Sequence, residues 1–255
     1  MPSSGELSAA WRRISLMTTD STMLQLRRQE MVAAHTTDFL LLTAGFQTAG
    51  RGQHGTYWEA AAGENLLFGI RCRPVFLPAA RQFFLSEVQA LAVASALDAY
   101  VNDITLKWPN DVYYRDRKIC GMLLEHDLSG GHITATVTGV GLNVNQTRFG
   151  SDTPNPVSLR QILGRPVDCE ELLYHICHYF EQYYNHLKRG GEHELHHLYL
   201  SRLYRREGFH PYQTAGGRRF LARIAGVAPS GELCLCEENG RESSYAFKEV
   251  KFLSM

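Results

Sequence analysis

The chain has 255 residues, and its 26 Lys and Arg balance its 26 Asp and Glu, so the formal net charge is zero. A protein that mainly binds duplex DNA or RNA needs a basic excess to displace condensed counterions, so this balance argues against that class. The composition, 44% apolar and 20% charged, is that of a globular protein and not of an acidic disordered chain. The length fits one large domain, or a medium domain with a small one appended.

The compartment is predicted from the N-terminus and the cysteines. Segment 1–17 lacks the basic start and long apolar stretch of a secretory signal. No run approaches the roughly 18 apolar residues that cross a bilayer. The six cysteines are scattered without a C-x-x-C pair, which is typical of reduced and mostly buried thiols. We therefore expect a cytoplasmic protein that does not bind a membrane.

Short apolar or alternating runs predict strands through the first 145 residues. Asp20-Ser21-Thr22 lies between the first strand and a short helix predicted over 23–31, and either hydroxyl is a suitable N-cap. The predicted strands cover 13–18, 39–46, 65–72, 104–108, 112–115, 118–125 and 132–145.

Helical periodicity and capping residues predict three longer helices. Ser86 and Gln89 have the spacing of a capping box, and so do Asp168 and Glu171. These helices are predicted over 86–101, 169–188 and 192–204.

The order of these elements predicts the fold class. Strands with hairpins, flanked by helices, indicate an α+β (or α/β) domain with a mixed sheet over 1–205. From 206 onward short strands follow one another closely, and Asn239-Gly240 is a strong hairpin signal. We expect a catalytic domain over 1–205 and a small β-barrel over 206–255.

The first motif with chemical content is the segment 47–58, QTAGRGQHGTYW. Its three glycines let the backbone approach a ligand, and their amides can cradle an anion. Arg51 adds a fixed positive charge. No Gly-Lys-Ser/Thr follows, so it is not a Walker A loop, and no helix or later acidic residue supports a Rossmann fingerprint. A flexible surface loop without a ligand is the alternative.

The second motif is Lys107-Trp-Pro-Asn-Asp111 and the strand that follows it. Pro109 interrupts the strand and leaves Asn110 and Asp111 in a predicted tight turn. Lys118 would project from one face of the next strand, where a buried amine is costly unless it meets an anion. The alternative is a plain β-hairpin with solvated lysines.

With the segment 139–143 (GVGLN), these motifs resemble those of the biotin protein ligases, also called biotin–[acetyl-CoA-carboxylase] ligases. The resemblance runs from Asp20-Ser21-Thr22 to the segment 245–250 and covers most of the chain. Several motifs in the family's order are far more specific than any one of them. The resemblance implies a class II synthetase-like catalytic domain, flanked by helices, and an SH3-like domain over 206–255.

The resemblance also implies a two-step reaction. Biotin and ATP would form biotinyl-5′-AMP and pyrophosphate, with Mg²⁺ neutralising the triphosphate. A lysine of a biotin carboxyl carrier protein or domain would then attack the acyl carbon and release AMP. Two anions must meet in the first step, so the site needs cations where charge builds up.

The residues that the resemblance points to fall into three groups. Cations at the reacting anions would be Lys118, Lys107 and Arg51. Contacts to biotin would come from Ser21, Thr22, Gln47, Gly50, Arg51, Gly52, Gln53, Lys118 and Gly121. Contacts to the nucleotide would come from Thr56, Trp58, Asn110 and Asn143, and a Mg²⁺ ligand from Asp111.

The sequence departs from the family at three positions. Met23 stands where the family often has Asn, which removes one expected head-group contact. His54 and Thr56 replace arginines of some members, so the adenylate is expected to be held less tightly, and a cationic His54 would compensate only at acid pH. About twenty residues precede Ser21, so we expect the form without a DNA-binding domain, as a monomer or homodimer.

The sequence leaves three alternative interpretations. His193-Glu-Leu-His-His197 fits the zinc-peptidase pattern H-E-x-x-H, but no third ligand follows, so a polar surface helix is the expected structure. Lipoate ligases and octanoyltransferases share the fold, with a different Arg-Gly-Gly loop and no Trp-Pro in the Asn-Asp motif. The third alternative is a biotin-binding sensor without turnover.

Overall fold

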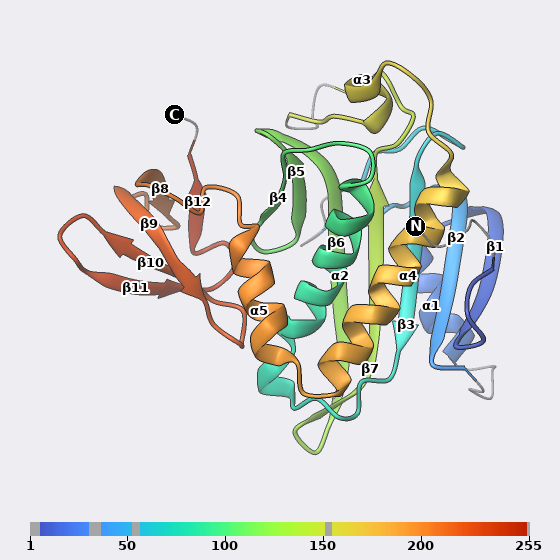
Figure 1. Cartoon of the computed structure of the whole chain (residues 1–255), viewed down its shortest axis with the longest axis horizontal. Helices are drawn as coiled ribbons and strands as arrows, with labels where there is room; N and C mark the ends of the chain where they lie inside the picture. Colours follow the sequence, from blue (N-terminus) through green and yellow to red (C-terminus); the bar gives the residue numbers. More distant parts are fainter. Residues whose placement is uncertain (1–5, 31–36, 53–56, 151–154, 254–255) are drawn as a thin grey trace.

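The computed structural model describes residues 6–30, 37–52, 57–150 and 155–253. A seven-stranded sheet, in the order β1-β2-β3-β7-β6-β5-β4, forms the body, with helices packed on it (Figure 1). β1 runs parallel to β2, and every other neighbouring pair is antiparallel. The predicted α+β fold with a mixed sheet is therefore confirmed.

The strands of the large sheet agree with the predicted runs. β6 is longer than predicted because its pairing with β7 continues to the tip of the hairpin. The strands are β1 (Trp11–Thr19), β2 (Phe39–Gln47), β3 (Leu66–Cys72), β4 (Ile104–Lys107), β5 (Asp111–Tyr114), β6 (Arg117–Ser129) and β7 (His132–Leu142).

The helices cover both faces of this sheet. Because side chains alternate along a strand, neighbouring residues such as Leu41 and Leu42 enter different apolar clusters. One cluster packs under α2, α4 and α5, and the smaller one packs under α1. The helices are α1 (Thr22–Glu30), α2 (Phe83–Leu97), α3 (Leu159–Leu163), α4 (Cys169–Lys188) and α5 (Glu192–Ser201), with a 3₁₀ turn η2 (Ala79–Arg81).

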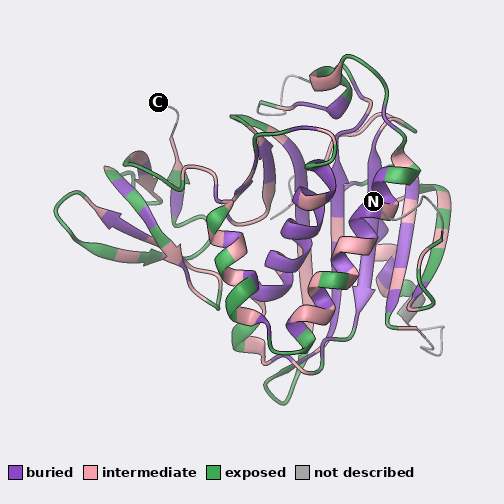
Figure 2. Ribbon diagram, viewed as in Figure 1, coloured by how far each residue is buried: buried purple, intermediate pink, exposed green. Residues whose placement is uncertain are grey.

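Helix α2 corrects one prediction. It begins at Phe83, so Ser86 and Gln89 lie inside the helix and the predicted capping box is wrong. Gln89 is fully buried and accepts a hydrogen bond from Thr138 Oγ1 at 3.1 Å. Figure 2 shows why: α2 lies between the sheet and the outer helices and is buried almost all round.

Two helix starts depend on side-chain caps. The Asp168 half of the predicted capping box of α4 is confirmed, because Asp168 Oδ1 accepts from the amides of Glu170 and Glu171. Helix α3 was not predicted, although Ser158 and Gln161 form a complete capping box at its start. The segment is only five residues long, so no periodicity marks it.

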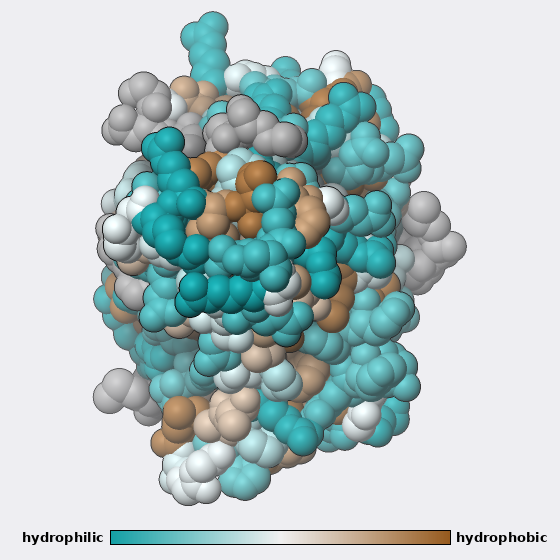
Figure 3. Space-filling view, turned by 90° about the vertical axis from the view of Figure 1, so that its left-hand side faces the viewer, coloured by the Kyte–Doolittle hydropathy of each residue, from teal (hydrophilic) through white to brown (hydrophobic). Residues whose placement is uncertain are grey.

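The C-terminal strands form a second, antiparallel sheet in the order β11-β10-β9-β8-β12, which is consistent with an SH3-like domain. The predicted hairpin at Asn239-Gly240 is confirmed, with Gly240 at φ +84° between β10 and β11. Figure 3 shows this side of the molecule as largely hydrophilic, with apolar side chains in small groups. The strands are β8 (His210–Thr214), β9 (Arg219–Val227), β10 (Leu233–Glu237), β11 (Glu242–Tyr245) and β12 (Val250–Phe252).

The two sheets meet at the turn between β4 and β5. Trp108 Nε1 donates to the carbonyl of Gly231 at 2.9 Å, and its ring lies 6.2 Å from that of Phe247. This contact brings β12 and the loop before it beside the KWPND turn. Over the described ranges, none of the helices combines the length and the hydropathy needed to cross a bilayer.

Candidate functional site

The sequence motifs meet at one cavity of about 570 Å³. It lies at the start of α1, the end of β2, the β4–β5 turn, the first half of β6 and the end of β7. The predicted residues that line it are Ser21, Thr22, Gln47, Arg51, Gly52, Trp58, Lys107, Asn110, Asp111, Lys118, Gly121 and Asn143.

The glycine-rich loop folds back on itself at the cavity entrance. The amide of Trp58 donates to the carbonyl of Gly50 at 3.1 Å, and the backbones of Arg51 and Tyr57 form an isolated antiparallel β-bridge. A Cβ on Gly50 would lie 2.8 Å from the Trp58 carbonyl, so this close approach requires glycine. Gly50 therefore shapes the loop and is not itself a lining residue of the cavity. The predicted residues Gln53, His54 and Thr56 lie outside the described residues.

Trp58 lies flat against a floor made of two glycines. Gly121 and Gly141 are register partners on β6 and β7. A Cβ on Gly141 would lie 2.3 Å from Trp58 Cε2, and one on Gly121 would lie 2.7 Å from Cζ3. Sequence reasoning missed Gly141 as a site residue, although pairing the two strands of the hairpin places it opposite Gly121.

Lys118 and Asp111 form an ion pair on the cavity wall. Lys118 Nζ lies 2.7 Å from Asp111 Oδ1, and the two side chains are 24% and 18% exposed. The Lys118 ammonium also lies 5.5 Å from the centre of a Trp58 ring. The alternative of a solvated lysine is therefore wrong for Lys118. Asp111 begins β5, so the predicted tight turn contains Asn110 but ends before Asp111.

Lys107 is the second cation of the wall. Its Nζ donates to Tyr113 Oη at 2.8 Å and lies 4.6 Å from the centre of that ring. Burial lowers the pKa of Lys107, the nearby Asp111 carboxylate opposes this shift, and the Lys118 ammonium adds to it. Burial has the opposite effect on an acid: it raises the pKa of Tyr113, so the hydroxyl that accepts the hydrogen bond from Lys107 stays neutral near pH 7.

A polar corner forms where α1 starts. The backbone amide and the hydroxyl of Thr22 both donate to Gln47 Oε1, at 2.7 and 3.1 Å. Ser21 and Thr22 are 1% and 3% exposed, so these groups are held rigidly in a buried setting. Asp20 accepts from the Ser21 amide at 2.7 Å and fixes the turn into the helix. This corner offers hydrogen-bonding groups to a small polar ring.

Met23 also faces the cavity. It is 2% exposed and packs on Gly139, where a Cβ would lie 2.6 Å from Met23 Cγ. The departure noted in the sequence therefore places a thioether beside the polar corner. Gly139 is a further site residue that sequence reasoning missed.

The two predicted asparagines hold the backbone around the cavity. Asn110 Nδ2 donates to the Met122 carbonyl, and Asn143 Nδ2 donates to the Val157 carbonyl at 3.1 Å. Asn143 Oδ1 is buried without a hydrogen-bond partner among the described residues. Both side chains line the cavity, and their contact with a nucleotide stays a prediction.

The small sheet supplies lining residues that were not predicted. Their signal is tertiary, since only the docking of β12 beside the KWPND turn brings them to the site. They are Phe247, Lys248, Val250, Lys251 and Phe252.

The residues of the cavity fit a metal ion that is bound together with a nucleotide, and not one that is held by protein ligands alone. In the described ranges no group of three or more His, Cys, Asp or Glu is arranged to hold a metal. Asp111 contributes one carboxylate beside a cavity lined by cations. Mg²⁺ is commonly held by one or two carboxylates together with substrate phosphates, and Asp111 fits that mode.

The zinc-peptidase pattern has another structural role. His196, between the two histidines of H-E-x-x-H, approaches Glu87 Oε1 to 2.7 Å with its Nδ1. Glu87 is fully buried on α2, and burial raises its pKa, while its hydrogen bond to His196 raises the pKa of that imidazole. The segment is part of α5, and its His196 connects this surface helix to the buried helix α2.

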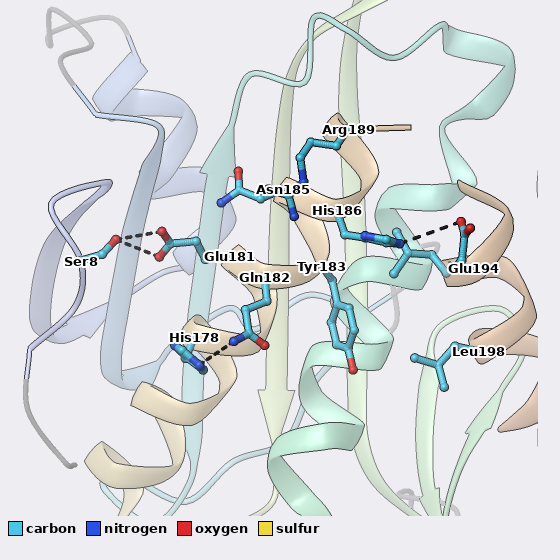
Figure 4. A pocket seen from close by; sticks show the side chains of 11 residues that line it. Ser8, His178, Glu181, Gln182, Tyr183, Asn185, His186, Arg189, Glu194 and Leu198 are labelled. Atoms are coloured by element: carbon cyan, nitrogen blue, oxygen red, sulfur yellow. Dashed lines mark hydrogen bonds and ion pairs between the residues drawn. The ribbon is translucent and has the colours of Figure 1, made fainter. Parts of the chain in front are cut away.

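A larger hollow of about 720 Å³ lies between α4 and α5 (Figure 4). Its polar side chains pair with one another: Ser8 donates to Glu181, Gln182 contacts His178, and His186 lies 4.0 Å from Glu194. None of the predicted site residues lines it. The chemistry of the sequence motifs belongs to the smaller cavity.

Comparison with known proteins agrees with this geometry. The model of the biotin/lipoate A/B protein ligase family matches residues 17–143. A biotin–[acetyl-CoA-carboxylase] ligase of Paracoccus denitrificans is 32% identical over 205 residues, which are 77% of this chain and 83% of that protein. A bifunctional ligase/repressor BirA of Bacillus spizizenii is 30% identical over 157 residues, or 59% of this chain. That match spans about half (47%) of the Bacillus protein.

The fold has close counterparts among solved structures. The biotin protein ligase from Aquifex aeolicus in complex with biotin and ATP superposes with a TM-score of 0.77 at 24% identity, over 94% of this chain and 99% of that one. At this identity the likeness shows a shared fold. Together with the Paracoccus relative, the order of motifs around one cavity leads to a single conclusion: this chain belongs to the biotin protein ligase family.

Proposed function

We propose that this protein is a biotin–[acetyl-CoA-carboxylase] ligase, which forms biotinyl-5′-AMP from biotin and ATP and transfers biotin to a lysine of a carrier protein. The observation that carries the proposal is the convergence of Lys118, Trp58 and the Ser21–Thr22–Gln47 corner on one cavity. The names of the Paracoccus relative and of the Aquifex structure, which contains biotin and ATP, support it.

The polar corner binds the head group of biotin. The ureido ring carries both N–H donors and a carbonyl acceptor, so it needs fixed partners of both kinds. Gln47 is already oriented by two hydrogen bonds from Thr22, which lowers the entropy lost on binding. The thioether of Met23 adds an apolar contact beside it.

The cations act on the first step. A carboxylate oxygen of biotin attacks the α-phosphorus of ATP, and the bond to pyrophosphate breaks. Lys118, Lys107 and Arg51 line the same cavity, so their positive charges offset the repulsion between the two anions. Lys118 has the central role because it stands beside both Trp58 and Asp111.

The nucleotide side is formed by Trp58, Asn110 and Asn143. The indole of Trp58 offers a flat face for the adenine ring. Bound Mg²⁺ supplies charge neutralisation at the triphosphate, and Asp111 would be its protein ligand. By the family resemblance, Arg51, Gly52 and Gln53 would keep water from the reactive anhydride, and Thr56 would contact the nucleotide.

In the second step, a lysine amine of a biotin carboxyl carrier protein attacks the acyl carbon. A C–N bond forms, the C–O bond to AMP breaks, and the amine loses its proton. We propose that residues 1–205 carry this chemistry and that residues 206–255 form an SH3-like domain. The docked small sheet completes one wall of the cavity.

Transfer to a carrier domain tests the proposed function and separates it from its rivals. Purified protein is incubated with ATP, Mg²⁺ and a biotin carboxyl carrier domain, and label incorporation is compared for biotin, lipoate and octanoate. Incorporation of biotin alone is expected. Incorporation of lipoate or octanoate in its place would identify the related acyl ligases, and biotin binding without incorporation would identify a sensor.

A further inference from the structure

The glycine-rich loop is tied to the large sheet by a chain of charges. Arg51 Nη2 lies 3.5 Å from Glu125 Oε1 on β6. The other oxygen of Glu125 accepts from Arg27 Nε on α1 at 2.9 Å, and Arg27 Nη1 donates to Asp127 at 3.0 Å. One carboxylate thus joins the loop, the strand and the helix that begins at the polar corner.

Strand geometry places Glu125 on the side that carries the cavity. Gly121, Leu123 and Glu125 alternate along β6 and therefore face the same way, and the first two line the cavity. The irregularity of the β6–β7 pairing begins only after Asp127, so the alternation is intact at Glu125. Glu125 stands about 13 Å along the strand from Gly121.

An arginine at the cavity mouth needs such a partner. The Arg51 side chain is 44% exposed and has many rotamers, and fixing it on substrate binding would cost conformational entropy. Arg27 pairs with Glu125 through Nε and with Asp127 through Nη1, so the partner of Arg51 is itself held by an ion pair.

We propose that Glu125 is a positioning residue, which orients the Arg51 guanidinium toward the anions of the adenylation step. This inference rests on the proposed function. Glu125 acts through Arg51 and touches no reacting atom. A carboxylate that merely competed with substrate for Arg51 would have the opposite effect on the rate, because its removal would free the arginine.

The test is biotin-dependent ATP–pyrophosphate exchange by the full chain and its variants. Glu125→Gln keeps the shape and removes the charge. It is expected to lower kcat about two- to fivefold, as a partly exposed charge pair allows, with a smaller change in the KM for biotin. Asp98→Asn is the matched control, since it removes a partly exposed carboxylate that pairs with Arg202, and neither residue lines the cavity, so it should keep the wild-type rate.

An Arg51→Ala background distinguishes positioning from a structural role. There Glu125→Gln should cause no further loss, whereas equal losses in both backgrounds would overturn the inference. A Glu125→Gln enzyme as fast as wild type, or faster, would also overturn it. Wild-type protein without exchange would instead refute the proposed function. Thermal unfolding of each variant verifies that it is folded.

Discussion

At the level of single residues, the shape of the site depends on three glycines whose lack of a side chain makes room for larger neighbours. Gly121, Gly139 and Gly141 lack side chains where Trp58 and Met23 lie against the sheet. Motif order made Gly121 predictable. Gly139 and Gly141 belong to the motif at 139–143, but their contacts with Met23 and Trp58 follow only from the strand register and the packing.

Gly141→Ala tests the glycine floor under Trp58. The added Cβ would lie 2.3 Å from Trp58 Cε2, so the indole must move. Because Trp58 is proposed to stack on adenine, the KM for ATP should rise about tenfold, with a smaller change in the KM for biotin, as expected for a lost aromatic contact of 1–1.5 kcal/mol. Steady-state kinetics with each substrate varied in turn measures this.

Gly226→Ala is the control for that change. Gly226 lies on β9, and an added Cβ there meets no atom within 4 Å. Its kinetics should match the wild type. An unchanged KM for ATP in Gly141→Ala would contradict the proposed contact between Trp58 and the adenine ring.

At the scale of elements, the sequence predicted the strands better than the helix boundaries. Alternation and turn residues mark each strand of the large sheet, and Asp168 marks the start of α4. The start of α2 was misplaced because the helix is buried nearly all round, which removes the periodicity that locates one face. The elements that pack around α2 are set by the tertiary structure, so the helix boundary could not be located from the sequence of α2 alone.

The buried pair between α2 and α5 gives a pH prediction. The hydrogen bond to Glu87 raises the pKa of His196 in the folded state. The stabilisation by this pair is therefore fully present below about pH 6.5, the ordinary pKa of histidine, and is lost as the pH rises through the raised pKa. Above that pKa, Glu87 is buried beside a neutral imidazole, and burial already disfavours its charged form.

Glu87→Gln removes the charge and reveals this dependence. The melting temperature of wild type minus that of Glu87→Gln should fall between pH 6 and pH 9, by about 3 °C for an effect of about 1 kcal/mol. Differential scanning calorimetry at both pH values measures it. Glu192→Gln is the control, because Glu192 lies on the same helix and pairs with Arg81, which stays charged over this range. Its melting-temperature difference should not change with pH, and an equally constant difference for Glu87→Gln would contradict the prediction.

At the scale of the whole molecule, the balance of charge hides a local excess. The described lining of the cavity holds two carboxylates, Asp111 and Glu59, and five basic residues: Arg51, Lys107, Lys118, Lys248 and Lys251. The lysines of the small sheet could not be assigned to the site from sequence, because they reach it only through docking. The cytoplasmic location, the oligomeric state and the absence of DNA binding stay predictions.

Docking of the small sheet should matter for ATP. Trp108→Phe removes the Nε1 hydrogen bond to Gly231 and should loosen the wall that β12 adds. The KM for ATP is expected to rise about threefold, together with a loss of about 1 kcal/mol of stability. Trp11→Phe removes another indole hydrogen bond, to the Glu181 carboxylate, and neither residue lines the cavity. It should cost similar stability without changing the KM, and equal KM changes in both variants would refute the docking role.

If this cavity activates biotin with ATP through Lys118, biotin-dependent ATP–pyrophosphate exchange must depend on that lysine. Exchange is measured side by side for wild type and Lys118→Ala. We expect exchange with biotin but not with lipoate, and a loss of about 10²- to 10³-fold in the variant, as for removal of a main charge-stabilising group. A folded Lys118→Ala protein that exchanges at the wild-type rate would contradict it.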